Sequence, residues 1–94
     1  MKIQQDIHGN KGAFYIEENG EWIAELSYVR SGKDIMTIDH TEVDKKLQGE
    51  GIGQDMVAEA VKFARENDLR VKATCPYAHK VLAETPEYED VFIK

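Results

Sequence analysis

The sequence predicts an α+β fold, a mixed and mainly antiparallel sheet with two helices in the order β-β-β-β-α-β-α. The first half alternates apolar and polar residues between turn signals, which is typical of half-buried strands. A strongly amphipathic segment follows a glycine-rich loop near the middle, and another alternating run comes after it. A strand, a helix and a further strand favour a right-handed crossover, so the strands around His40 and Val71 should be parallel.

The N-terminal segments are predicted to pair as antiparallel strands. Residues from Lys2 to about His8 are weakly strand-like, and the Gly-Asn-Lys-Gly stretch at 9–12 is typical of a turn. The runs 13–17 and 22–29 then flank the pair Asn19-Gly20, and this dipeptide is the strongest short hairpin signal. We expect a hairpin there.

A second hairpin is predicted to extend this sheet. The polar residues 31–34 separate the preceding strand from the run 35–43. Alternation along that run places Met36, Ile38, His40 and possibly Glu42 on one face, and Ile35, Thr37, Asp39, Thr41 and Val43 on the other.

The second half is predicted to form a helix, a strand and a second helix. Apolar residues recur near helical spacing at Ile52, Met56, Val57, Ala60, Val61, Phe63 and Ala64. Asn67 and Asp68 can end this helix, and the alternating run from Leu69 to Cys75 predicts a strand. Pro76 suits the first turn of a helix through Glu84, Pro86 stops its continuation, and residues 87–94 should form a short irregular or strand-like tail.

The loop before the first helix has the composition of an anion-binding site. It is the run Gln48-Gly49-Glu50-Gly51-Ile52-Gly53. Glycines allow the backbone to turn and to approach a ligand closely, while the first N–H groups of a helix have no intrahelical partner and can point at a phosphate. The alternative interpretation is a flexible turn that enters a helix and binds no ligand.

Length and composition restrict the class of protein. Ninety-four residues suffice for one domain, 1–94, and no apolar run approaches the roughly 20 residues that span a bilayer. No secretory signal is recognisable, so a cytoplasmic protein is expected. A net charge of −6 without a basic stripe argues against a general nucleic-acid binder. The single cysteine, Cys75, has no partner for an internal disulfide.

Together these features make the chain resemble the GCN5-related N-acetyltransferase (GNAT) superfamily. Its acetyl-CoA signature, Arg/Gln-x-x-Gly-x-Gly/Ala, is matched by Gln48, Gly51 and Gly53. The stretches 38–43, 64–67 and the Cys-Pro-Tyr-Ala run at 75–78 resemble the small single-domain branch of that superfamily. The resemblance covers about residues 12 to 92.

The resemblance implies an acetyltransferase that uses acetyl-CoA as cosubstrate. The loop from Gln48 to Gly53 would bind the CoA pyrophosphate through main-chain N–H groups, and the pantetheine arm would lie between parallel strands ending near Val43 and Cys75. A backbone N–H around Val43 would polarise the acetyl carbonyl. Tyr77 is a candidate, by location, for the phenolic acid that protonates the CoA thiolate. The acceptor would be an unknown amine or protein, and the chain a monomer or weak dimer.

His40 and Cys75 match the His and Cys that the small branch places near the thioester. Cys75, activated by His40, could attack the acetyl carbonyl and carry the acyl group. Alternatively, His40 could deprotonate an amine or a water directly, with Cys75 only lining the pocket. Each residue also has a structural interpretation: Cys75 as a small buried hydrophobe, and His40 as a sheet histidine hydrogen-bonded to Thr41 or Asp39.

Other ligands are disfavoured by the residues present. His8 and His79 have no spacing with each other or with Cys75 that indicates a metal site, so no metal is expected. The glycine loop lacks the Lys-Ser/Thr of an ATP-binding P-loop and the third spaced glycine of a dinucleotide fingerprint. The competing class is a non-catalytic module that binds acyl-CoA or a protein partner.

Overall fold

The computed structural model describes residues 2–94, so Met1 of the predicted unit 1–94 lies outside it. Its strands are β1 (Gln4–His8), β2 (Lys11–Glu18), β3 (Glu21–Ser31), β4 (Ile35–Val43) and β5 (Arg70–Ala73). Its helices are α1 (Ile52–Glu66) and α2 (Pro76–Glu84), with short 3-10 turns η1 (Lys45–Leu47) and η2 (Pro86–Tyr88). The predicted order of strands and helices is confirmed, and the two 3-10 turns are additional elements.

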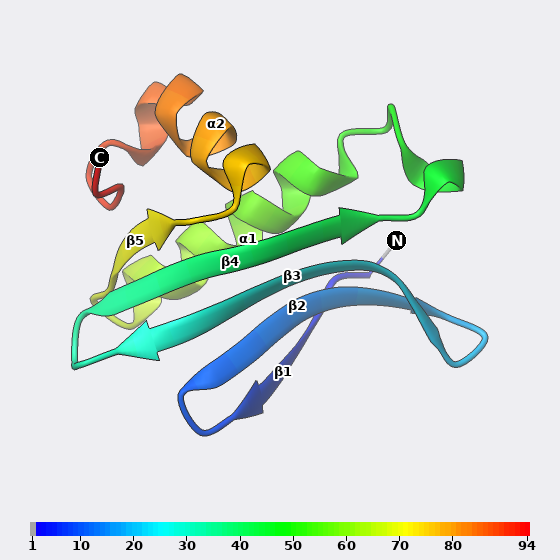
Figure 1. Ribbon diagram of the computed structural model, residues 1–94, viewed down its shortest axis with the longest axis horizontal. Coiled ribbons are helices and arrows are strands. Elements are labelled where there is room, and N and C mark those ends of the chain that lie inside the picture. Colours follow the sequence, from blue (N-terminus) through cyan, green and yellow to red (C-terminus); the bar gives the residue numbers. More distant parts are fainter. Residues whose placement is uncertain (1) are drawn as a thin grey trace.

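One five-stranded sheet of order β1-β2-β3-β4-β5 forms the body of the molecule (Figure 1). The first four strands are joined by antiparallel pairings, and β4 pairs with β5 in parallel. At the tip of the β2–β3 hairpin, Asn19 and Gly20 have φ values of 53° and 81°, as the tight hairpin turn predicted there requires. The predicted mixed sheet and the predicted parallel pairing of the strands that contain His40 and Val71 are therefore present in the fold.

A β-bulge in β4 overturns the predicted division of that strand into two faces. Ser27 of β3 is opposite His40, whereas the next residue, Tyr28, is opposite Ile38. Asp39 is the extra residue, and it accepts a hydrogen bond of 2.7 Å from the Ser27 hydroxyl. Because side chains opposite each other share a face, the bulge inverts the alternation after Ile38.

The correction concerns which side chains of β4 point toward α1. Met36 and Ile38 lie on the α1 face with buried Tyr28, as predicted, but Thr41 and Val43 join them there. His40 and Glu42 lie on the opposite face, in register with Ser27 and Glu25. The predicted grouping of Met36, Ile38, His40 and Glu42 on one face is wrong because it assumed an uninterrupted alternation.

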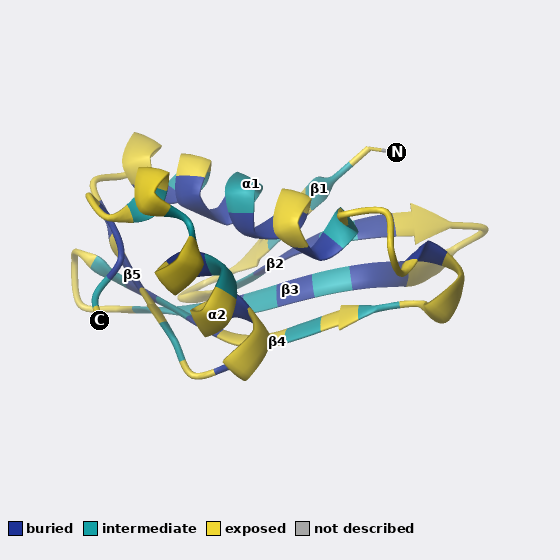
Figure 2. Cartoon of the chain, turned by 90° about the horizontal axis from the view of Figure 1, so that it is seen from above, coloured by how far each residue is buried: buried dark blue, intermediate teal, exposed yellow. Residues whose placement is uncertain are grey.

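Helix α1 crosses one face of the sheet and encloses the core with it (Figure 2). Its buried residues are Gly53, Met56, Val57, Ala60, Val61 and Ala64. They pack against buried sheet residues that include Leu26, Met36 and Ile38, and burial of each large apolar side chain contributes about 1.5–3 kcal/mol. The helix ends at Glu66 and Asn67 is its C-cap, in agreement with the prediction that Asn67 and Asp68 end it, and the Asn67 side chain donates to the Phe63 carbonyl oxygen at 2.9 Å.

The last third differs from the sequence prediction in two details. The strand after α1 ends at Ala73, so Cys75 is not a strand residue but the N-cap of α2, with Pro76 in its first turn. The tail forms η2 and then a single parallel bridge between Phe92 and Val71. The bidentate pair of Arg65 with Asp90 holds this tail on α1, with N···O distances of 3.1 and 2.7 Å.

The two faces of the sheet are covered unequally. Helix α1 lies behind the sheet in Figure 1, and α2 lies beside α1 along the β5 edge. Across the described chain, no helix covers the opposite face of β1 to β4, which we call the open face (Figure 1). No helix within residues 2–94 has both the length and the apolar character needed to cross a bilayer.

Candidate acyl-CoA site

The parallel strands β4 and β5 separate halfway along β4. Their pairing ends at Ile38 opposite Ala73, although β4 continues to Val43. Just beyond it, the backbone N–H groups of Thr74 and Cys75 both donate to the Ile38 carbonyl oxygen, at 3.0 and 3.4 Å. The chain then turns into α2, so within residues 2–94 no strand pairs with the second half of β4 on that edge. This separation leaves a gap between β4 and the start of α2.

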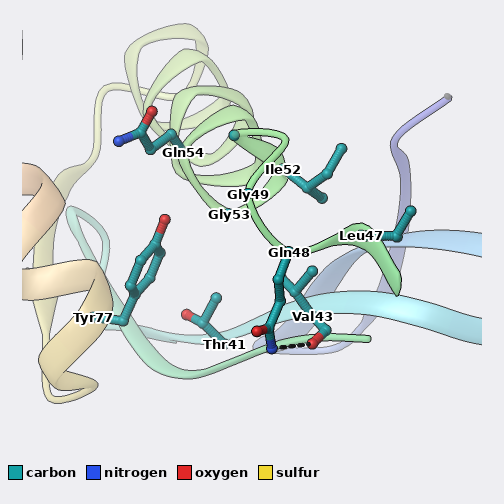
Figure 3. Close-up of a pocket in the computed structure, with 10 residues that line it drawn as sticks. Thr41, Val43, Leu47, Gln48, Gly49, Ile52, Gly53, Gln54 and Tyr77 are labelled. Carbon is teal, nitrogen blue, oxygen red and sulfur yellow. Dashed lines mark hydrogen bonds between the residues drawn. The ribbon is translucent and has the colours of Figure 1, made fainter. Parts of the chain in front are cut away.

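A pocket of about 620 Å³ opens where the end of β4 meets the start of α1 (Figure 3). Its lining comes from β4, the 3-10 turn η1, the glycine loop, the first turn of α1 and the first turn of α2. The lining residues are Thr41, Val43, Leu47, Gln48, Gly49, Gly51, Ile52, Gly53, Gln54 and Tyr77. Its volume is in the range of cavities that hold small ligands, about 300–1,000 Å³.

The glycine loop presents bare backbone to this pocket. Gly49 and Gly51 have φ values of 87° and 75°, in the left-handed region where a side chain is strained. Gly51 is the N-cap of α1 and has no side chain to satisfy the helix N–H groups, and among residues 2–94 no partner accepts from the amides of Ile52, Gly53 and Gln54. These unsatisfied donors and the positive end of the helix dipole favour an anion.

The Tyr77 ring of α2 lies against the first turn of α1 and forms part of the pocket lining (Figure 3). A Cβ placed on Gly53 would lie 2.5 Å from the Tyr77 hydroxyl oxygen, so only glycine allows the ring to pack this closely against α1. Burial and, to a smaller extent, the negative charge of Asp55 raise the pKa of Tyr77. The phenol is therefore protonated at neutral pH and can donate a proton or a hydrogen bond.

The peptide groups at the end of β4 are oriented by two hydrogen bonds. The Asp44 N–H donates to the Ile23 carbonyl oxygen at 2.8 Å, and Gln48 Nε2 donates to the Val43 carbonyl oxygen at 3.4 Å. Successive backbone groups of a strand point toward opposite edges, so the Val43 N–H points away from β3 and toward the gap beside α2. This is the orientation that a carbonyl-polarising donor needs.

Cys75 lies beside Thr41 rather than beside His40. The Cys75 side chain is buried, with 9% exposure, and its Sγ is 3.4 Å from the Thr41 hydroxyl oxygen. Burial alone would raise the pKa of the Cys75 thiol. Hydrogen bonds from the Thr41 hydroxyl and from the backbone at Ala78, Tyr77 and Thr41 outweigh it, so the pKa is lower than that of an ordinary thiol.

His40 lies on the open face, where its side chain is 54% exposed. Its Nε2 is 3.6 Å from Glu42 Oε1, and no hydrogen bond to Thr41, Asp39 or Cys75 occurs among residues 2–94. His40 and Thr41 are adjacent in β4 and point to opposite faces. The imidazole is therefore placed to meet a molecule on the open face.

The pocket brings together most of the predicted cofactor residues. Of these, Val43, Gln48, Gly49, Gly51, Ile52, Gly53 and Tyr77 line it, while Glu50 does not and is exposed. Sequence reasoning missed Thr41, Leu47 and Gln54. No residue type in β4 indicates the bulge that turns Thr41 toward the pocket. Gln54 directly follows the glycine motif in the first turn of α1, so the predicted helix start could have indicated that it lies at the pocket. Within residues 2–94, no three potential metal ligands converge.

Comparison with known proteins identifies the family. The family model described as GCN5-related N-acetyl-transferase matches residues 13–91. The chain is 40% identical over 63 residues to bovine Protein NATD1, a match that spans 67% of this chain and 56% of the bovine protein. It is 38% identical over 85 residues to Protein NATD1 of Gallus gallus, which covers 89% of this chain and 77% of that protein. The match therefore spans little more than half of the bovine relative.

Solved structures share this fold. The solution structure of a GCN5-like protein from Staphylococcus aureus superimposes with a TM-score of 0.76 at 33% identity, covering 96% of this chain and 87% of that one. A GNAT family acetyltransferase from Elizabethkingia anophelis, solved with acetyl-CoA bound, superimposes with a TM-score of 0.57 at 17% identity over 66% of this chain and 41% of that one. At that identity the second likeness concerns the fold alone.

Proposed function

Because the chain belongs to the GCN5-related N-acetyltransferase family, we propose that it binds acetyl-CoA in the pocket at the start of α1 and transfers the acetyl group to an amine. One observation supports this most strongly. The unsatisfied amides of Ile52, Gly53 and Gln54 face the same pocket as Val43 of the separated strand β4. A long ligand with a diphosphate and a thioester needs these two features together.

The loop from Gln48 to Gly53 would hold the diphosphate, and two lysines precede it. Lys46 is engaged by Glu18, at an N···O distance of 2.5 Å. Lys45 forms no ion pair within the described part of the chain and can add a positive charge near the loop. The pantetheine arm would then run along Thr41 and Val43 into the gap between β4 and α2, with the acetyl oxygen near the Val43 N–H.

In the proposed reaction the amine nitrogen forms a bond to the acetyl carbon, and the carbon–sulfur bond of the thioester breaks. His40 takes the proton that the amine loses, and the Tyr77 hydroxyl gives a proton to the departing CoA sulfur. The raised pKa of Tyr77 keeps that proton available at neutral pH. His40 would act from the open face, so the acceptor would approach from the side opposite to the pocket.

A second route would use Cys75 as nucleophile. Its lowered pKa increases the thiolate fraction, and its Sγ adjoins Thr41, which lines the pocket. The thiolate would attack the acetyl carbon, CoA would leave as the thiolate, and the amine would then displace Cys75. His40 has no contact with Cys75 among the described residues, so activation of the thiol would come from Thr41 and the start of α2.

Intact-mass analysis after incubation with acetyl-CoA separates the two routes. Direct transfer predicts that Cys75→Ala retains CoA release with an amine panel, while His40→Gln loses about 10²–10⁴-fold, the usual range for a general base. The Cys75 route predicts an acetyl mass increment on the wild type that Cys75→Ala lacks. If neither variant changes turnover and no acetyl adduct forms, neither route is correct.

The competing proposal is a non-catalytic module that binds acyl-CoA or a protein partner. Binding of acetyl-CoA without CoA release above background across amines and peptides would favour that module. The cytoplasmic location, the single-domain organisation and a monomeric or weakly dimeric state stay predictions from the sequence.

A further inference from the structure

We propose that the hairpin end of the open face is a docking surface for a lysine-containing basic segment of a partner protein. This inference rests on the proposed function, because it names the class of acceptor for the same site. The docking surface consists of Tyr15, Glu17, Trp22, Glu25, Glu42 and Asp44, and we call it the acidic–aromatic patch.

Strand register separates charges along the open face. Lys11, Val29, Thr37 and Lys72 form one cross-strand row, near the start of β4. Tyr15, Glu25 and Glu42 form another row, near the end of β4, with Glu17 and Trp22 paired beyond it. His40 and Ser27 lie between the two rows. The basic end and the acidic end are thus separate, and His40 borders the acidic end.

Two aromatic side chains are stacked in the acidic–aromatic patch. The rings of Tyr15 and Trp22 are nearly parallel, at 8°, with centroids 4.1 Å apart. Trp22 is 42% exposed, although tryptophan side chains are on average highly buried in folded proteins. An indole face that is held in place and open to solvent attracts an ammonium or guanidinium group through a cation–π interaction.

The carboxylates of the patch are only partly compensated by this chain, because the Lys46 ammonium group that pairs with Glu18 interacts with Asp44 as well. Glu25 lies directly opposite Glu42, and like charges in that arrangement are destabilising. The Glu42 carboxylate lies 3.6 Å from Nε2 of His40, and within residues 2–94 no Lys or Arg forms an ion pair with Glu17, Glu25 or Asp44. A basic partner would relieve this repulsion, and an amine that accepts an acetyl group is itself cationic at neutral pH.

The shape of the patch favours a polypeptide over a small free amine. It contains a small recess, a cavity of about 70 Å³ lined by Trp22, Glu25, Glu42 and Asp44 together with Ile23 and Ala24. Small-molecule sites are usually several times larger, about 300–1,000 Å³. A recess of this size accepts the end of one lysine side chain, while the flat strands around it support the adjoining residues of a peptide.

Tryptophan fluorescence tests the proposal directly, because Trp22 is the only tryptophan. The full chain is titrated with a short synthetic peptide of alternating lysine and serine, and with the same peptide carrying glutamine for lysine. We expect only the lysine peptide to change the emission. Glu25→Gln should weaken its binding about two- to fivefold, as expected for an exposed ion pair. The matched control Glu66→Gln, an exposed glutamate of α1, should leave binding unchanged.

The proposed docking surface would be wrong if the lysine peptide caused no change in emission, or if Glu25→Gln and Glu66→Gln weakened peptide binding equally. It would also be wrong if spermine changed the emission in a Glu25-dependent way while the peptide did not. Calorimetry with Trp22→Ala, which lacks the fluorophore, should show weaker peptide binding.

Amide shifts of Gly49 and Gly53 with acetyl-CoA, measured on the same sample, report separately on the proposed function. Peptide binding without acetyl-CoA binding would refute that function and leave the docking surface intact.

Discussion

Cys75 and Thr41 form a local unit that sets the chemistry of the thiol. The Thr41 hydroxyl lies 3.4 Å from Cys75 Sγ, and backbone groups at the start of α2 add further hydrogen bonds that stabilise the thiolate. Hydrogen bonds that stabilise the charged form oppose the desolvation that favours the neutral form. A lowered pKa means that the thiolate population, and with it reactivity, rises at a lower pH than in an ordinary cysteine.

Thr41→Val should raise the pKa of Cys75, because it removes the hydroxyl and keeps the shape. The rate of iodoacetamide alkylation plotted against pH should then rise at a higher pH than in the wild type, while Thr41→Ser should retain the wild-type profile. Thr37→Val, on the same strand and the opposite face, is the control. An unchanged profile in Thr41→Val would show that the hydroxyl does not stabilise the thiolate.

At the scale of elements, the glycine loop depends on backbone geometry that side chains cannot adopt easily. Gly51 begins α1 with a φ of 75°, and a Cβ there meets nothing closer than Gln54 Oε1 at 4.0 Å. The strain of a substitution would thus come from the backbone and not from crowding. The loop motif and the amphipathic pattern of α1 made this element predictable, since both are local signals.

Gly51→Ala should lower the free energy of unfolding by about 1–2 kcal/mol, the usual cost of a left-handed conformation for an L-residue. It should also weaken acetyl-CoA binding about tenfold, equivalent to about 1.4 kcal/mol. Gly32→Ala is the matched control, because Gly32 has a φ of 63°, has open space around it and lies in the distant β3–β4 turn.

Chemical denaturation and calorimetric titration measure both effects. Gly32→Ala should lose similar stability and keep the wild-type affinity for acetyl-CoA. Equal affinity in both variants would mean that the loop conformation does not matter for the ligand.

The β4 bulge marks the limit of prediction at this scale. The run from Ile35 to Val43 contains no glycine or proline that would indicate an irregularity. The extra residue Asp39 has no register partner in β3, but its carboxylate accepts a hydrogen bond from the Ser27 hydroxyl of that strand. A tertiary contact therefore decides that Thr41 faces the pocket and His40 does not. The strand itself was predictable, but the faces of its second half were not.

At the scale of the whole molecule, the pocket and the open face share strand β4. The second half of β4 contributes Thr41 and Val43 to the pocket and His40 and Glu42 to the open face. The fold order and the parallel crossover were predictable from periodicity and chain topology. The open face was not, because it results from which surface the helices leave uncovered (Figure 1).

Titration of the ¹⁵N-labelled protein with acetyl-CoA would locate the acetyl-CoA site residue by residue. We predict saturable amide shifts at Gly49, Gly51 and Gly53 and at Thr41 and Val43, with the Lys11 end of the sheet unaffected. Shifts absent from these amides at millimolar acetyl-CoA would contradict the account.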